Sequence, residues 1–286
     1  MNLPSSIRRV ELAPGYPVLE IQHAAAQARV ALHGAQLMEW TPAGHKPVIY
    51  LSPEAVYRED KAIRGGIPVC WPWFGHHADP KLPQHGFVRT RIWEVVEAAE
   101  DAAGVKLKLT LQDDEATRCL WPHAFRVVVE MHLGAELHVS LKMENTDAAA
   151  VTITGALHTY FVVGDIRQVT IEGLDGASYL DTVGPHMERK QSGDVIIDRE
   201  VDRIYRSSAE VRIKDAAFGR VISIQGAGSK STVVWNPWIE KAHALADLPD
   251  EDYPHFVCVE TANAWNDQIT LAPGAAHELA ATIRIQ

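Results

Sequence analysis

Two side chains suited to proton transfer, His158 and Glu260, each lie near the end of a predicted strand. His158 stands in "TGALHTYF" and Glu260 in "HFVCVETAN". Histidine titrates near neutral pH, and a histidine with a carboxylate forms a common general acid and base. A histidine that only hydrogen-bonds a neighbouring carbonyl would explain His158 equally well. Most of the fourteen histidines of the chain lie beside turns or on polar strand faces and suggest no site.

The residues around Glu260 indicate a buried strand. Phe256, Cys258 and Glu260 alternate with Val257 and Val259, so both faces of this strand are largely apolar. A glutamate in such a place is seldom fully buried unless it has a partner. A carboxylate of this kind has a proton affinity that its surroundings can tune for a reaction.

The elements that must position these residues are strands. Apolar and polar residues alternate in "VKLKLTLQ", and "FRVVVEMHLGAELHVSLKM" alternates on both sides of Gly134, which predicts a hairpin. Helical periodicity is nearly absent, and a short turn of helix around "DLPDED" is the best candidate. The pattern predicts an all-β fold, a large antiparallel β-sandwich with minimal helix. No linker or repeat interrupts residues 1–286, so we expect a single domain.

The composition excludes several classes of partner. A net charge of −10 argues against binding to nucleic acid or to an anionic membrane surface. The three cysteines include no CxxC pair and predict neither a disulfide framework nor a zinc site. The N-terminus has no apolar signal core, and no run of eighteen apolar residues is present. We therefore expect a cytoplasmic protein, and a monomer.

Five sequence blocks resemble the signature blocks of the hexose-6-phosphate mutarotases, also called glucose-6-phosphate 1-epimerases, a branch of the aldose 1-epimerase superfamily. The blocks span residues 64 to 263 in the family's order; they are "RGGIPVCWPWFG", "QHGFVR", "LHTYF", "VVWNPW" and "VCVETAN". The resemblance implies a β-supersandwich of the galactose-mutarotase type, which agrees with the predicted strands. It also implies an isomerase that interconverts the α and β anomers of a hexose 6-phosphate, with glucose 6-phosphate the first choice.

The same resemblance implies roles for single residues. It makes His158 the general acid and Glu260 the general base. It places four residues against the substrate: Arg64, Gln84, Arg89 and Asp202. Ring opening requires the C1 hydroxyl to lose a proton while the ring oxygen gains one, so anionic Glu260 would take the first and protonated His158 give the second. We expect the two to face each other across a sugar-sized gap, with no cofactor, because the roles reverse on closure.

The stretch "KAIRGGIPVCWPWFG", residues 61–75, predicts a stiff and irregular loop at this site. Its glycine pair and prolines suit neither a helix nor a central strand. We expect the glycines after Arg64 to let the backbone approach a ligand. Arg64 and Arg89 are expected to converge on the phosphate, because the guanidinium fork matches phosphate oxygens.

The aromatic residues near this loop have two possible roles, core anchor or sugar contact. For two of Trp71, Trp73 and Phe74 we favour the core. Trp235 and Trp238, in "VVWNPW", are expected to form the wall of the site. Asn236, between them, is expected to point into it.

The segment "GHHADPKLPQHG" is the only cluster that suggests a metal. Adjacent histidines on a strand point to opposite faces, and the segment has no HxH pair, so we predict no metal site. We expect His85 to line the pocket and to hydrogen-bond a sugar hydroxyl.

The sequence leaves three other functions open. An aldose 1-epimerase for unphosphorylated sugars would not need the two arginines. A catalytically silent carbohydrate-binding protein on the same fold would not need both His158 and Glu260. A metal enzyme of the cupin type would be expected to show an HxH pair.

Overall fold

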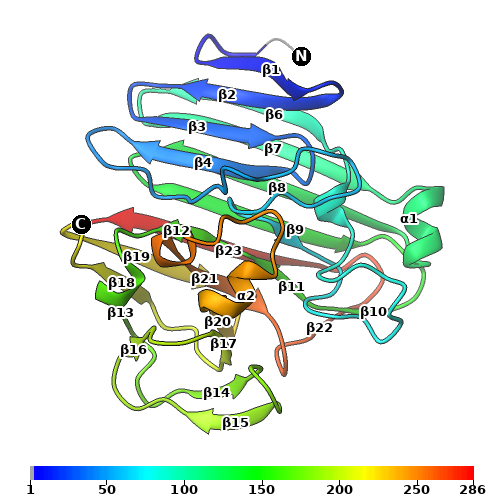
Figure 1. The fold of residues 1–286 in the computed structure, drawn as a ribbon. Coiled ribbons are helices and arrows are strands. Elements are labelled where there is room, and N and C mark those ends of the chain that lie inside the picture. Colours follow the sequence, from blue (N-terminus) through cyan, green and yellow to red (C-terminus); the bar gives the residue numbers. More distant parts are fainter. Residues whose placement is uncertain (1–2) are drawn as a thin grey trace.

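Antiparallel strands make up most of the computed structural model, which describes residues 3–286 (Figure 1). The strands of this part of the chain form sheets of nine, eight, four and two members. The prediction of a large antiparallel all-β fold with minimal helix is confirmed.

The nine-stranded sheet contains the strands whose alternation is clearest in the sequence. The predicted hairpin is present: Gly134 ends its first strand, and Leu133 lies opposite Leu137. In sheet order the strands are β16 (Val195–Ile196), β13 (Val169–Glu172), β18 (Val211–Asp215), β19 (Arg220–Ala227), β23 (Ala276–Ile285), β9 (Leu137–Asn145), β8 (Phe125–Gly134), β7 (Gly104–Gln112) and β6 (Glu94–Asp101).

The eight-stranded sheet carries the residues that the sequence analysis singled out for chemistry. Its strands in order are β15 (Met187–Lys190), β14 (Ser178–Asp181), β17 (Val201–Tyr205), β20 (Ser231–Asn236), β21 (Phe256–Asn263), β11 (Gly155–Leu157) and β5 (Val69–Cys70), with β12 (Tyr160–Val162) also paired to β21. All eight residues of β21 are buried, which confirms the buried strand expected there.

Two smaller sheets complete the strands. One consists of β1 (Ile7–Ala13), β2 (Tyr16–Gln22), β3 (Ala26–Ala31) and β4 (Gln36–Pro42), and the other of β10 (Val151–Ile153) and β22 (Ile269–Leu271). The four-stranded sheet is joined to the nine-stranded sheet by a hydrogen bond that Trp40 Nε1 donates to the Gly134 carbonyl at 3.1 Å. Buried residues of both sheets belong to one hydrophobic core.

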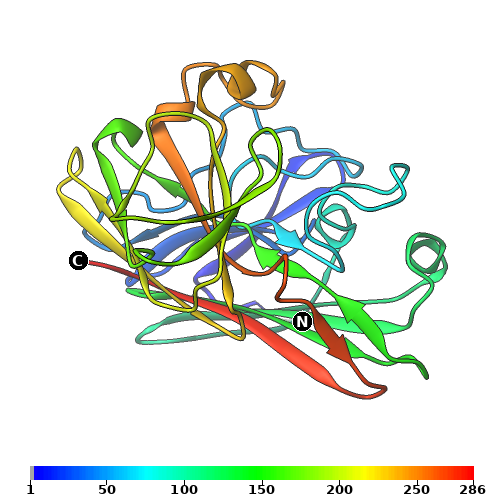
Figure 2. The same cartoon turned by 90° about the horizontal axis from the view of Figure 1, so that it is seen from below.

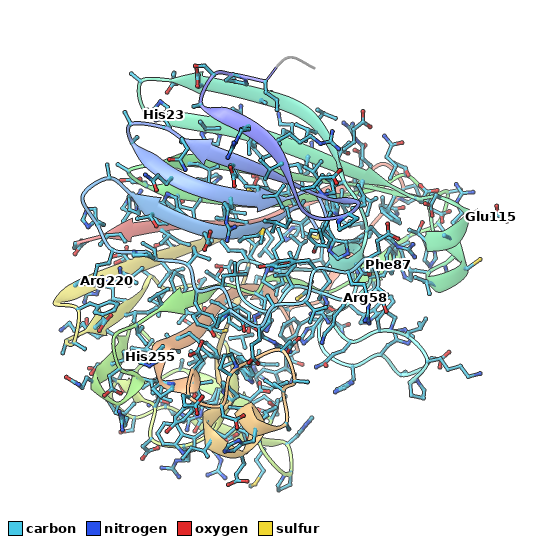
Figure 3. All side chains as sticks on the ribbon, turned by 45° about the horizontal axis from the view of Figure 1, so that its top comes forward. His23, Arg58, Phe87, Glu115, Arg220 and His255 are labelled. Atoms are coloured by element: carbon cyan, nitrogen blue, oxygen red, sulfur yellow. The ribbon has the colours of Figure 1, made fainter. Side chains whose placement is uncertain are left out.

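That main core fills the space between the large sheets. Figure 2 shows the nine-stranded sheet along one side of the molecule and α2 (Trp238–His243) on the opposite side. Side chains occupy the interior, where Phe87 is buried, while Glu115 lies at the periphery (Figure 3). One face of the eight-stranded sheet is therefore committed to the core, and its other face is turned toward α2.

Strand β21 divides its residues between these two faces. Val257 and Val259 belong to the main core, whereas Phe256 and Cys258 pack with residues near α2. Glu260 shares the face of Cys258, because alternate residues of a strand point the same way. The strand thus presents its only carboxylate on the side away from the main core.

The helices are short, and the sequence located them poorly. Two α-helices occur in residues 3–286, α1 (Glu115–Leu120) and α2, together with 3-10 turns at Val88–Thr90, Ile166–Gln168 and Tyr253–His255. The helical turn predicted at "DLPDED" is wrong, because residues 247–252 form non-helical turns just after α2. Helix α1 begins with a capping box, in which the Asp114 side chain accepts from Thr117 N at 2.7 Å.

The glycine pair after Arg64 serves the close packing of the backbone, and the expected approach of a ligand to it stays a prediction. Gly65 and Gly66 both have positive φ, and a Cβ on them would lie 2.6 Å from the Tyr50 carbonyl oxygen and 2.4 Å from that of Leu37, respectively. The backbone here runs between two other segments and bonds to both: Gly66 N donates to Tyr50 O and Ile67 N to Leu37 O. Only glycine permits this contact, and it fixes the position of Arg64.

We predict that Gly66→Ala destabilises the protein more than Gly44→Ala. The two glycines have similar φ values of +72° and +78°, but a Cβ on Gly44 would meet nothing within 4 Å. The shared φ strain should cost about 1 kcal/mol, and the backbone clash at Gly66 should add about 1–3 kcal/mol. Urea unfolding of both variants measures the difference, and equal losses would contradict the role given to Gly66.

Candidate active site

His158 and Glu260 lie side by side on the face of the eight-stranded sheet that points toward α2. Glu260 is on β21, and His158 follows β11 in the turn before β12. His158 Nε2 is 3.4 Å from Glu260 Oε1, and the two residues are 9% and 1% exposed. The sequence suggested this acid and base only from their chemical types, and the structure places them in direct contact.

The expected sugar-sized gap between them is not present, and the chemistry explains why it is not needed. The C1 hydroxyl and the ring oxygen of a cyclic sugar are bonded to the same carbon. An acid and a base that serve these two oxygens can therefore stand next to each other on one side of the sugar. The 3.4 Å separation suits that arrangement.

Several polar atoms of the buried pair lack a hydrogen-bond partner. Neither carboxylate oxygen of Glu260 nor Nδ1 of His158 has a hydrogen-bond partner among residues 3–286. Buried polar groups without partners are rare, because each costs about 1–3 kcal/mol. Such groups are expected where a substrate supplies the missing partners.

Burial sets the protonation of the pair. It raises the pKa of Glu260 well above its usual value, and the negative charge of Asp202 adds to this effect. Burial, followed by the positive charges of Arg89 and Arg64, lowers the pKa of His158 to about 3. Both shifts favour a neutral imidazole and a protonated carboxyl group over the ionised pair that the sequence analysis assumed.

Two aromatic rings hold His158 in place. The ring of Tyr160 stacks on the imidazole with centroids 5.0 Å apart and an angle of 14°, and Trp235 meets it edge-on at 6.0 Å. Trp235 is buried, as expected for a wall residue. Trp71 and Trp73 are buried and Phe74 is half-buried, which agrees with core positions for two of these three.

Arg64 and Arg89 come from different loops, and the charges of both act on His158. Arg64 Nε donates to Asp247 Oδ1 at 3.0 Å, and its Nη1 donates to the Tyr160 hydroxyl at 3.1 Å. Arg89 Nη2 donates to the backbone carbonyl of Gln84 at 2.6 Å. Arg64 is thus paired with a carboxylate, whereas Arg89 bonds a carbonyl and forms no ion pair with a carboxylate of residues 3–286.

His85 is presented to this group by a strained turn. It has φ of +61°, and its Nδ1 accepts a hydrogen bond from Gly75 N at 3.1 Å. Burial, and next the charge of Arg89, lower the pKa of His85 well below the usual value. The neutral ring therefore carries its proton on Nε2, and its centroid lies 5.6 Å from that of His158.

Comparison with known proteins adds to this geometry. The family model described as "Aldose 1-epimerase" matches residues 17–284. The chain belongs to the aldose 1-epimerase family. The resemblance found in five sequence blocks is therefore confirmed.

Individual members of the aldose 1-epimerase family agree with this result. A protein of Escherichia coli (strain K12), named "Putative glucose-6-phosphate 1-epimerase", is 37% identical over 270 residues, which cover 94% of this chain and 90% of that protein. A crystal structure of a "putative mutarotase" from Salmonella typhimurium is 33% identical and superposes with a TM-score of 0.93 over 99% of this chain and 95% of its own. A galactose 1-epimerase from Lactobacillus acidophilus shares the fold, with a TM-score of 0.74 over 100% and 99% at 14% identity.

Three further residues were predicted to contact the substrate of an aldose 1-epimerase: Asp202, Gln84 and Asn236. Asp202, on β17, lies close enough for its charge to act on Glu260, and its carboxylate is 4.0 Å from Lys241 Nζ. The Gln84 side chain is exposed. Asn236 is 0% exposed, and its amide donates to the carbonyls of Tyr253 and Phe256. Asn236 therefore braces the backbone and does not point into the site as expected.

The segment with His76, His77 and Asp79 forms no metal-binding cluster. Within residues 3–286 no three His, Cys, Asp or Glu side chains are grouped so that they would hold a metal ion. None of the helices in that range is long and apolar enough to cross a membrane.

The sequence analysis did not predict a functional role for two residues at the site, Tyr160 and Asp247. Tyr160 is in the "LHTYF" block, but its contact with both Arg64 and His158 depends on β12 pairing with β21. Asp247 lies in "DLPDED", where only a helical turn was expected. A carboxylate followed by leucine and proline in a loop carries no signal for an arginine 183 positions away.

Proposed function

We propose that this chain is a hexose-6-phosphate mutarotase, an isomerase that interconverts the anomers of glucose 6-phosphate or a related hexose 6-phosphate. The observation that carries the proposal is the buried contact of His158 with Glu260, near enough to Arg64 and Arg89 for their charges to act on the histidine. The names of close relatives in the aldose 1-epimerase family support it. A binding protein would gain nothing from an acid and base in contact.

The pair supplies the proton transfers of both directions. In ring opening, ionised Glu260 takes the proton of the C1 hydroxyl while protonated His158 gives its proton to the ring oxygen, and the C1–O5 bond breaks. The products are the open aldehyde, protonated Glu260 and neutral His158. After rotation about C1–C2, the same transfers in reverse close the ring on the other face.

The neutral form of the pair is thus the form that closes the ring. Burial favours it, since it holds no separated charges. The ionised form has the same number of protons and differs only in their location. One enzyme molecule can therefore turn over repeatedly without exchanging a proton with solvent.

The remaining polar groups bind the sugar phosphate. Arg64 and Arg89 are proposed to hold the phosphate, because guanidinium groups bond its oxygens in a fork geometry. His85 Nε2–H donates to a sugar hydroxyl, and Asp202 accepts from one. We keep Gln84 among the proposed contacts, since its exposed side chain adjoins the Arg89 bond.

The test of this proposal compares two sugars. Exchange between anomers is followed by NMR saturation transfer for glucose 6-phosphate and for free glucose at equal concentration. We expect the wild-type protein to accelerate exchange of the phosphate at least about tenfold more, in kcat/KM, which corresponds to about 1.4 kcal/mol. An equal or greater effect on free glucose would point instead to an epimerase for unphosphorylated aldoses.

The protonation of the pair predicts a flat pH profile. The pair holds one proton from the lowered pKa of His158, about 3, up to the raised pKa of Glu260. The turnover number kcat should therefore show no change near pH ~6.5, the usual pKa of a histidine. The profile is measured in kcat, because the phosphate of the substrate has a pKa of about 6 and its titration alters kcat/KM. A step in kcat at the usual histidine pKa would contradict this assignment.

Three further expectations belong to the proposal. Residues 1–286 are taken as one domain, since one hydrophobic core includes residues of the N-terminal and C-terminal strands. Unpaired Cys70, Cys119 and Cys258 suit the reducing cytoplasm. A monomer is expected, and light scattering of the purified protein measures it.

A further inference from the structure

Asp247 is a buried carboxylate that contacts Arg64 but belongs to none of the predicted site residues. It is 5% exposed and lies in the loop after α2. Its Oδ1 accepts from Arg64 Nε at 3.0 Å, and its Oδ2 is 3.4 Å from Lys61 Nζ. Its backbone carbonyl accepts from Ser52 Oγ at 2.7 Å. The carboxylate is therefore fixed at both its side chain and its backbone.

The far side of the guanidinium is fixed as well. Arg64 Nη1 donates to the Tyr160 hydroxyl, and the Tyr160 ring stacks on His158. Asp247 and Tyr160 thus hold two of the three guanidinium nitrogens in one plane. Nη2 donates to no side chain or carbonyl of residues 3–286, so this nitrogen remains for a ligand.

We propose that Asp247 is a positioning residue, which holds Arg64 so that Nη2 is directed at the phosphate of the substrate. The inference rests on the proposed function and names a determinant of its specificity for phosphorylated sugars. A flexible arginine would lose side-chain freedom on binding the phosphate. Asp247 removes that loss in advance, because it orders the side chain in the free protein.

The carboxylate of Asp247 has two opposite effects on the affinity for the phosphate: it orders Arg64, which strengthens binding, and it carries a negative charge. Its negative charge repels the phosphate dianion, so its charge alone would weaken binding. The acceptor oxygen and the charge can be separated, because asparagine keeps the oxygen and loses the charge. A positioning role and a purely electrostatic role therefore predict different orders of affinity among Asp247 variants.

The experiment measures anomer exchange of glucose 6-phosphate by wild type, Asp247→Asn and Asp247→Ala. Asp247→Asn should keep a KM equal to or below that of wild type. Asp247→Ala should raise KM at least about tenfold and leave kcat within about twofold. The KM for free glucose, where measurable, should be the same in all three. Asp247→Glu, which keeps the charge but displaces the carboxylate, should behave like Asp247→Ala and replaces it if alanine prevents folding.

A second readout follows the arginine itself. The Arg64 Nε–H resonance should exchange slowly with water in wild type and Asp247→Asn, and quickly in Asp247→Ala. Asp252→Ala is the matched control, because this carboxylate of the same loop accepts from the Tyr50 hydroxyl at 2.6 Å instead of from Arg64. It should lower thermal stability but leave KM and the Arg64 resonance unchanged.

The outcomes separate the inference from the function on which it rests. If wild type does not prefer glucose 6-phosphate to glucose, the proposed function fails whatever Asp247 does. If wild type prefers the phosphate but Asp247→Ala keeps its KM, the positioning role alone is overturned. An Asp247→Asn variant with KM raised as much as that of Asp247→Ala overturns it too, because the acceptor oxygen would then not suffice.

Discussion

Replacing His158 with asparagine, or Glu260 with glutamine, should lower the rate of anomer exchange at least about 10²-fold. Glutamine keeps the size of Glu260 and asparagine keeps a polar group at His158, and each substitution removes one of the two groups that carry the proton. The His158 Nε2 and Glu260 Oε1 atoms are 3.4 Å apart, so neither role can pass to a more distant group without a change of structure. NMR exchange with glucose 6-phosphate measures the rate, and circular dichroism checks that each variant is folded.

His33→Asn is the matched control for the histidine. His33 is buried like His158, but it bonds the Tyr16 hydroxyl and the Glu59 carbonyl, each at 2.9 Å. This substitution should lower stability without lowering kcat. If His158→Asn exchanged anomers at a near-normal rate, the assigned acid would be wrong.

Glu260→Gln should at the same time raise the melting temperature at pH 7. In the unfolded chain Glu260 ionises above about pH 4.3, whereas burial raises its pKa in the folded protein. Above that pH the folded state must retain a proton that the unfolded state releases, so stability falls as pH rises toward the folded pKa. Glutamine avoids this cost. The gain should shrink toward pH 4, and each kcal/mol corresponds to about 2–4 °C.

The second large effect concerns the arginines. Arg64→Ala and Arg89→Ala should each raise the KM for glucose 6-phosphate at least about tenfold, since a charge-assisted hydrogen bond contributes about 1.5–3 kcal/mol. Arg64→Ala should have the greater effect. It removes a cation and also leaves the negative charge of Asp247, which is 5% exposed, near the phosphate.

Arg58→Ala is the control for this comparison. Arg58, which is labelled in Figure 3, lies six positions before Arg64. It is exposed and forms an ion pair with Asp60. It should leave KM unchanged within about twofold, because this guanidinium is exposed to solvent and paired with Asp60. Unchanged KM values for both Arg64→Ala and Arg89→Ala would show that the phosphate binds elsewhere.

The sheets were predictable because alternation reports burial directly. In β7, for example, Leu107 is buried and Lys106 is not, and the alternation of apolar and polar residues in the sequence predicts this difference. The helices were less predictable. Helix α1 depends on the Asp114–Thr117 capping box, which is a local signal in six residues with little apolar periodicity. The segment "DLPDED" is held by contacts with distant loops, through Asp247 and Asp252, and such contacts leave no local signal.

The site was predictable only where a side chain's chemistry was unusual for its position. Glu260 in an apolar strand and Arg64 before a glycine pair both stood out on that ground. Asn236 was misjudged, because an asparagine that bonds backbone carbonyls and one that bonds a ligand look the same in a sequence. The protonation of the pair also depended on the fold, since burial of both groups decides where the proton lies.

The alternation of β21 has a consequence for how such an enzyme can diversify. Val257 and Val259 contribute to the main core, while Cys258 and Glu260 lie on the face that carries the site. Substitutions of Val257 or Val259 should therefore differ in a mutational scan from those of Glu260. The valine substitutions should lower the amount of folded protein in the cell, whereas conservative substitutions of Glu260 should lower turnover at constant abundance. Neighbouring residues of one strand thus separate the stability of the protein from its chemistry.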